Sequence, residues 1–290
     1  MAESLIKRGH DLSLLDTNFG KNTLDIDCKK FVGDVREVKA LNQITAHPDI
    51  IFHAAAVSRV AWGEVDPRRC VEVNTVGLIN IIMWANKSSE RPHMIFASSR
   101  EVYGEPEVLP VVEGTPKRPV SVYGISKLMS EKMLEYLGHS MGTNYTIIRF
   151  SNVYGSRRDL PERVIPSFVR NALLGEPLEV YGGNQVLDFC FIHDVTSGLL
   201  KVIDKIEGHD QAVQNNDFQF TTSVGHSVKN LADMVKIATN SNSEIEYHEP
   251  RSYDVTRFIG DFSKAKKLLG YTPRVKLEVG IKKYLHDVVG

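Results

Sequence analysis

The sequence predicts an α/β fold built on a doubly wound parallel sheet. Short apolar strands, such as "DIIFHAAA" at 49–56 and "HMIFASS" at 93–99, alternate with helical stretches of ten or more residues. Strands with nearly continuous apolar character are typical of parallel sheets that are covered on both faces. The 290 residues are 42% hydrophobic and 24% charged, enough for one large domain or two smaller ones.

Helices and strands alternate through the first half of the chain. The first helix begins at Ala2 and is stopped by Arg8-Gly9-His10, with glycine just past its end, before an apolar run that ends at Asp16. Further strands are expected at 30–32, 49–56, 93–99 and 145–150, and helices at 35–44, 67–85 and 122–137.

The second half of the chain has a looser pattern. Beyond Asn152, short strands and helices are separated by loops and punctuated by prolines. We therefore expect a doubly wound α/β domain at 1–155 and a smaller C-terminal α+β domain at 156–290 that carries substrate specificity, with 185–210 returning to the first domain.

Composition excludes several classes of function. The formal charge is −1 and no dense run of Lys or Arg is present, so neither nucleic acid nor a membrane surface is an expected partner. No apolar stretch approaches the ~20 residues of a membrane helix. Cys28, Cys70 and Cys190 are far apart and lack metal-ligand spacing, which predicts reduced thiols in a cytoplasmic protein and no metal site.

The stretch "SVYGISK" at 121–127 carries the strongest chemical signal. Tyr123 and Lys127 are four residues apart at the start of a predicted helix, so both side chains share one face. Lowering a tyrosine pKa from about 10 toward neutrality requires roughly 4 kcal/mol of preferential stabilisation of the anion. A lysine ammonium with a second hydrogen bond provides it, which predicts that Tyr123 is a general base.

A serine pair supports this interpretation. Tyr-x-x-x-Lys is common by chance, and alone it is more typical of a half-exposed tyrosine beside a solvated lysine. Ser98 and Ser99, however, end the predicted strand at 93–99, and open α/β sheets bind ligands at the carboxyl ends of their strands.

Several motifs in order resemble one family over essentially the whole chain. These are "FVGDV", "IFHAAA", "VEVNTVG", "FASSREVYG", "YGISK", "RFSNVYG", "DFCFIHDV" and "DFSKAKKLLGY". Together they resemble the extended short-chain dehydrogenase/reductases, in their NAD-dependent nucleotide-sugar epimerase/dehydratase branch. The resemblance implies a Rossmann domain that binds NAD, a nucleotide-sugar substrate and an activity like that of the UDP-glucose 4-epimerases.

The resemblance also implies roles for individual residues. The catalytic group is Ser99, Tyr123 and Lys127, with Glu101 where some relatives keep a catalytic glutamate. The cofactor would contact Asp16, Asp34, Val35, His53, Ala54, Ala55, Asn74, Ser98, Tyr123, Lys127 and Phe150, and the substrate Ser99, Asn152 and Arg251. Structural roles compete: Asp16 and Asp34 as turn caps, His53 as a satisfied core histidine and Asn74 as a polar contact within a helix.

Two departures from the family pattern leave the activity open. Leu187 stands where many relatives carry an arginine that grips the diphosphate, which leaves Arg251 to do so alone. Glu101 favours a dehydratase or decarboxylase, but Arg100 replaces the aspartate that 4,6-dehydratases have beside it. The alternatives are therefore a 4,6-dehydratase or decarboxylase, or a non-catalytic dinucleotide-binding protein.

The start of the chain carries a further expectation. Family members place a strand and a Gly-x-x-Gly-x-x-Gly turn before the helix that here begins at Ala2. We expect a truncation that removes this central strand and leaves two open edges within the sheet. The resemblance also implies a homodimer formed by the helices at 67–85 and 122–137.

Overall fold

The computed structural model describes residues 1–20 and 25–289, which divide into two compact units. The first comprises Met1–Val102, Ser121–Ile148 and Asp204–Asp217, and the second comprises Tyr103–Val120, Arg149–Ile203 and Phe218–Gly290. In this division the chain passes between the units several times, and residues 204–217 return to the first. The expected domains, 1–155 with a return at 185–210 and 156–290, stay a prediction.

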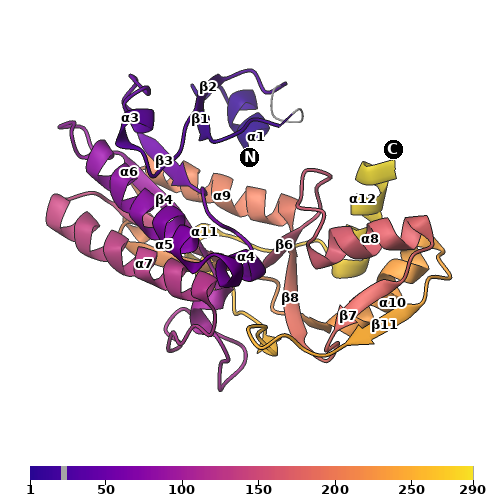
Figure 1. Cartoon of the computed structure of the whole chain (residues 1–290). Helices are drawn as coiled ribbons and strands as arrows, with labels where there is room; N and C mark the ends of the chain where they lie inside the picture. The colour runs from indigo at the N-terminus through magenta and orange to yellow at the C-terminus, as the bar shows by residue number, and fades with distance from the viewer. Residues whose placement is uncertain (21–24, 290) are drawn as a thin grey trace. The chain divides into compact units, whose positions relative to one another are not determined.

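The first unit begins with a helix and a two-stranded parallel sheet (Figure 1). Helix α1 (Ala2–Lys7) ends as predicted: Arg8 is its C-cap, and Gly9, which follows, has a φ of +85°, a conformation that glycine adopts without steric cost. Strands β1 (Ser13–Asp16) and β2 (Lys29–Val32) pair in parallel register. Both predicted strands are confirmed.

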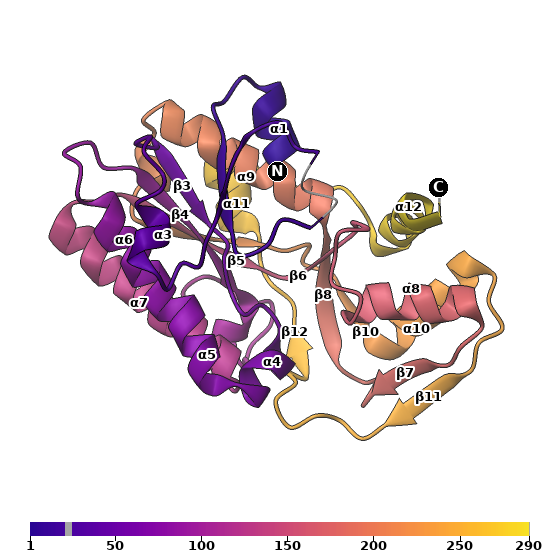
Figure 2. The ribbon, with the colours of Figure 1, turned by 45° about the horizontal axis from the view of Figure 1, so that its top comes forward.

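A four-stranded sheet follows and is visible in Figure 2. Its order is β3 (Ile50–His53), β4 (His93–Ser99), β5 (Tyr145–Phe150) and β9 (Asn216–Phe220), with β3 and β4 parallel. Over the described ranges 1–20 and 25–289, β1 pairs only with β2, and β3 pairs only with β4. Each of β1 and β3 therefore has an edge outside its ladder.

The helices of the first unit differ from expectation in detail. Helix α3 (Val38–Leu41) is shorter than the helix predicted at 35–44. Helix α4 (Val60–Val65) has no counterpart among the predictions. The predicted helix at 67–85 consists of α5 (Pro67–Val71), the π-helical turn η1 (Glu72–Val76) and α6 (Gly77–Ala85). Helix α7 (Val122–Met141) is longer than predicted. Single π-turns often occur at functional sites, and this one contains Asn74.

The apolar core of this unit joins the helices to the sheet. Leu78, Ile82 and Leu134 from α6 and α7 pack with Met94 and Phe96 of β4, and all five are fully buried. Gly77 permits a close approach at this core, because a Cβ there would lie 2.5 Å from Cγ2 of Val35. The core thus fixes α7 against the end of β4, where the predicted catalytic residues lie.

The second unit mixes parallel and antiparallel strand pairs, as expected for an α+β region. Strand β8 (Val186–Phe191) lies between β10 (Gly225–Ser227) and β12 (Arg257–Phe258) and also pairs with β6 (Asn152–Tyr154). Strands β7 (Leu178–Tyr181) and β11 (Ile245–His248) form a separate parallel pair. The other helices of this unit are α8 (Val164–Leu174), α10 (Val228–Thr239), α11 (Ser263–Leu269) and α12 (Leu277–Val289), and α9 (Ile192–Glu207) begins in this unit and ends in the first. The short helix η3 (Gln211–Val213) belongs to the first unit, and η2 (Arg100–Tyr103) begins in the first unit and ends at the first residue of the second.

Within residues 1–20 and 25–289, none of the helices combines the length and the apolar character that crossing a membrane requires.

Candidate active site

The predicted base Tyr123 lies in the first turn of α7. Ser121 caps this helix, since its Oγ accepts a hydrogen bond from the Gly124 amide at 3.1 Å. The carboxylate of Glu64 on α4 accepts another from the Val122 amide at 2.8 Å. Tyr123 is 9% exposed and Lys127 2% exposed, so the alternative of a half-exposed tyrosine beside a solvated lysine is wrong.

Lys127 is held beside the end of β4. Its Nζ donates to the carbonyl of Ala97 at 2.8 Å and lies 4.9 Å from the centre of the Phe96 ring and 5.9 Å from that of Tyr123. Burial lowers the pKa of the ammonium to about 8, and the Glu131 carboxylate partly opposes this shift. Near neutral pH the side chain therefore remains mostly charged.

The two serines at the end of β4 have different surroundings. The hydroxyl of Ser98 donates to the buried carboxylate of Glu131 on α7 at 2.5 Å. The Ser99 hydroxyl accepts from the amide of Glu101 at 3.2 Å. Ser98 thus links the strand to the helix, whereas Ser99 is the serine placed to meet a ligand at the carboxyl end of the strand.

Glu101 forms an ion pair with its neighbour Arg100. Arg100 Nη2 lies 2.8 Å from Glu101 Oε1, and both side chains are less than one-tenth exposed. A carboxylate with a guanidinium partner in a buried position is held in its charged form. Its arginine neighbour cannot donate a proton.

Asn74 serves the structure of the site. Its side chain accepts from the Val57 amide at 2.7 Å, and it donates to the Ser126 hydroxyl at 2.8 Å. These bonds link three parts of the first unit: the segment after β3, the turn η1 and helix α7. Asn74 therefore makes a polar contact within a helix, as the structural alternative predicted. Its contact with the cofactor stays a proposal.

His53 is buried at the end of β3 and stacks on Phe96, with ring centres 5.9 Å apart. Its Nε2 has no hydrogen-bond partner within residues 1–20 and 25–289. Burial, with a contribution from the charge of Lys127, lowers its pKa to about 3. The alternative of a satisfied core histidine therefore fails at Nε2. Ala54, which follows, is exposed, and Ala55 is half-buried.

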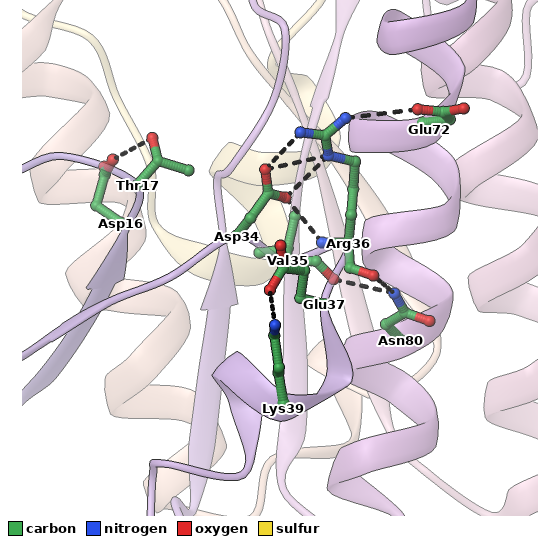
Figure 3. Close-up of polar contacts among 9 residues, drawn as sticks. All are labelled: Asp16, Thr17, Asp34, Val35, Arg36, Glu37, Lys39, Glu72 and Asn80. Carbon is green, nitrogen blue, oxygen red and sulfur yellow. Dashed lines mark hydrogen bonds and ion pairs between the residues drawn. The ribbon is translucent and has the colours of Figure 1, made fainter.

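Of the two predicted adenosine-binding carboxylates, Asp16 is the last residue of β1 and Asp34 follows β2 (Figure 3). Asp16 is exposed and accepts from the Asn18 amide at 3.1 Å. Asp34 accepts from the amide of Arg36 at 2.9 Å and from its guanidinium at 2.7 Å, and this pairing lowers the Asp34 pKa. Val35, between Asp34 and Arg36, is buried and packs in the core. Both carboxylates thus cap turns, as the structural alternative predicted.

The remaining predicted residues belong to the second unit. Phe150 packs edge-on against Phe220, with ring centres 5.9 Å apart. Asn152 donates to the carbonyl of Asp188 at 2.9 Å. The Arg251 guanidinium lies 3.9 Å from the centre of the Tyr181 ring. Leu187, at the position of the absent arginine, is a strand residue of β8.

Three residues near the pair were not predicted as site residues. Glu64 accepts a hydrogen bond from the start of α7, the Ser126 hydroxyl accepts one from Asn74, and Glu131 accepts one from Ser98. Glu131 follows Lys127 by four residues, a spacing that places it on the same helical face and that was visible in the sequence. Glu64 and Ser126 carried no such signal.

Over the described ranges, no cluster of three or more His, Cys, Asp or Glu side chains has the geometry of a metal site.

The residues of the first unit fit the nicotinamide end of a dinucleotide. A lysine ammonium has three hydrogens, and that of Lys127 has one oxygen acceptor, the Ala97 carbonyl, among residues 1–20 and 25–289. His53 adds a buried nitrogen without a partner in the same ranges. Such groups are satisfied when a ribose or amide binds beside them.

The comparisons with known proteins identify the family. Residues 1–216 match the sequence profile of the NAD dependent epimerase/dehydratase family. A putative UDP-glucose 4-epimerase of Methanocaldococcus jannaschii is 31% identical over 99% of this chain and 93% of its own. The chain therefore belongs to the NAD dependent epimerase/dehydratase family, as its motifs indicated.

Solved structures give the same fold. The UDP-glucose 4-epimerase of Thermotoga maritima with UDP-glucose is 29% identical, with a TM-score of 0.91 over 98% of this chain and 93% of that one. The UDP-glucose 4-epimerase of Thermus thermophilus with NAD is 26% identical, with a TM-score of 0.89 over 99% and 94%. The α/β fold with a parallel sheet is thus confirmed.

Another relative has a different activity in its name. UDP-glucuronic acid decarboxylase 1 of Xenopus tropicalis is 28% identical over 99% of this chain and 68% of its own. The match to the M. jannaschii protein spans 93% of its length and gives no support to the expected truncation.

Proposed function

We propose that this protein catalyses NAD-dependent epimerisation of a nucleotide-activated sugar at carbon 4, through a 4-keto intermediate. The observation that carries the proposal is the arrangement of Tyr123 and Lys127 on one buried face of α7, with the lysine hydrogen-bonded to the end of β4. A protein that only binds a dinucleotide needs no activated tyrosine. The names of the M. jannaschii and T. maritima relatives support the choice of a 4-epimerase.

The residues of the site divide the proton chemistry among them. Tyr123 takes the proton of the sugar 4-hydroxyl, and the Lys127 ammonium stabilises the tyrosinate that does so. Ser99 hydrogen-bonds the same oxygen. NAD, when bound, would supply the acceptor for the hydride of the sugar carbon and, in its reduced form, the donor that returns this hydride to the opposite face of the keto sugar. The keto sugar then turns and presents its other face, and Tyr123 returns the proton.

Other residues hold the ligands in this proposal. His53, Ala54, Ala55, Asn74 and Ser98 line the cofactor, Asp16, Asp34 and Val35 bind its adenosine, and Phe150 lies beside its nicotinamide. Asn152 and Arg251 contact the nucleotide sugar. Arg251 already stacks on Tyr181, so its guanidinium is held in one orientation.

A decarboxylase or 4,6-dehydratase is the second candidate. It is favoured by Glu101, a buried carboxylate two residues after Ser99, and the decarboxylase by the name of the X. tropicalis relative. Arg100 argues against a dehydratase, because the elimination of water needs an acid and a guanidinium does not donate a proton.

Product mass separates these activities. The protein is incubated with NAD and with UDP-, dTDP- and GDP-hexoses or UDP-glucuronic acid, and the products are analysed by mass and chromatography. We expect a product of unchanged mass and altered retention. A product that is lighter by one water or one carbon dioxide, and that Glu101→Gln no longer forms, would instead establish the second candidate. Binding of NAD without any product would favour a non-catalytic protein.

We also propose a cytoplasmic homodimer. Helices α6 and α7 pack together and expose large apolar side chains, among them Met83, Ile125, Met129 and Tyr136. Pairing of these helices across a two-fold axis would bury them. Light scattering that reports the mass of a monomer would reject the dimer.

A further inference from the structure

The helix that carries Tyr123 and Lys127 also carries a third buried polar side chain in line with them. Tyr123, Lys127 and Glu131 follow one another at four-residue intervals, which places them on one face of α7. Glu131 is 0% exposed. Glutamate is almost never fully buried unless it is paired, so its presence there needs an explanation.

Two hydrogen bonds join this face of α7 to consecutive residues of β4. Lys127 Nζ donates to the Ala97 carbonyl at 2.8 Å, and the Ser98 hydroxyl donates to Glu131 Oε1 at 2.5 Å. Hydrogen bonds with a charged partner are roughly twice as strong as neutral ones. The next residue of the strand is Ser99, so this pair of bonds sets the position of the serine at the site.

We propose that Glu131 is a positioning residue of this enzyme, whose carboxylate keeps Lys127 in its ammonium form and fixes the end of β4 through Ser98. The proposal rests on the proposed function only in taking Tyr123 as the base. Glu131 acts through Lys127 and Ser98 and does not itself contact the substrate.

The electrostatic part follows from the groups that face Lys127. Tyr123 and Glu131 face it from α7, Cys70 from α5 and His53 from β3. Burial lowers the Lys127 pKa to about 8, and the negative charge of the Glu131 carboxylate raises it. Loss of the Glu131 charge would therefore let Lys127 lose its proton at lower pH, and a neutral lysine does not stabilise a tyrosinate.

The main test compares Glu131→Gln with Glu135→Gln. Glutamine keeps an oxygen for Ser98 but removes the charge, whereas Glu135 is one turn further along α7, partly exposed and paired with Lys132 at 2.6 Å. We expect the alkaline limb of kcat to move by about one pH unit toward lower pH in Glu131→Gln, with less than a twofold change in KM. Glu135→Gln should match the wild type.

A second readout needs no substrate. The near-ultraviolet absorbance of tyrosinate is followed from about pH 6 to about pH 10 in each protein and in the same protein with Tyr123→Phe, so that the difference reports Tyr123 alone. In Glu131→Gln the tyrosinate signal at about pH 8 should fall several-fold. If the wild type converts no nucleotide sugar but this signal falls, the function proposal fails and the present one stands.

A structural role would give a different result. If Glu131→Gln lowered activity equally at every pH together with the unfolding temperature, or left both pH profiles unchanged, the proposal would be overturned. Glu131→Asp keeps the charge with a shorter reach and should retain the alkaline limb of the wild type. Failure of both variants to fold would also overturn it, because Glu131 would then be required by the fold itself.

Discussion

The two ends of the proposed cofactor site are built differently. Around Tyr123 and Lys127 the polar groups are buried and bonded across elements: Asn74 to α7, Lys127 and Glu131 to β4. Around Asp16 and Asp34 they are more exposed and bonded to residues two positions along the chain. The difference indicates that tertiary packing organises the catalytic end in advance, whereas local turns set the adenosine end.

The largest expected effect is at the catalytic end. Tyr123→Phe should lower turnover at least ~100-fold and leave NAD affinity nearly unchanged, because only the proton transfer is lost. Tyr136→Phe, an exposed tyrosine on the same helix, is the matched control. Steady-state kinetics and calorimetric titration with NAD measure the two quantities. If Tyr123→Phe kept most of the activity, the assignment of Tyr123 as the base would be refuted.

The buried network should also dominate stability. Asn74→Ala leaves the Val57 amide and the Ser126 hydroxyl without this partner and should lower the free energy of unfolding by about 2 kcal/mol. Asn80→Ala, at the adenosine end, removes bonds to the Val35 and Arg36 carbonyls in a less buried setting and should cost about 1 kcal/mol. Urea denaturation compares the two, and equal losses would contradict the contrast between the ends.

At the adenosine end the effect should appear in binding instead. Asp34→Asn should weaken NAD binding about tenfold, since an acceptor for the ribose hydroxyls loses its charge. Stability should change by less than about 1 kcal/mol, because the Arg36 partner is exposed to solvent. Glu37→Gln, whose side chain pairs with Lys39 on the same turn, is the control. If Asp34→Asn left the NAD affinity unchanged, capping its turn would be the only role of Asp34.

The smallest expected effect is a pH dependence of stability from His53. Its folded pKa of about 3 lies below the ordinary histidine value of 6.5, so the unfolded chain takes up a proton first as the pH falls. Stability should therefore decrease below about pH 6.5, by on the order of 1 kcal/mol at about pH 5.5. His53→Gln should reduce this slope in denaturant unfolding without NAD, whereas His286→Gln, at an exposed position, should not. If the free energy of unfolding depended on pH to the same extent in both variants, a group other than His53 would cause the effect.

The sequence by itself determined the order of elements and the catalytic motif. Apolar periodicity placed β4 and β5 at their observed bounds, and the spacing of Tyr123 and Lys127 placed them on one face of α7. Such patterns are local, because strand and helix periods follow from backbone geometry alone. The family followed from the order of the motifs.

Only the tertiary structure decided which polar groups meet. That Asn74 joins Val57 and Ser126, that Ser98 donates to Glu131, and that His53 keeps an unpartnered nitrogen within the described ranges depend on contacts between residues far apart in sequence. The π-turn at Glu72–Val76 and the repeated passage between the two units likewise arise from packing. A buried polar group must find its partner wherever the fold supplies one, and sequence spacing does not report that distance.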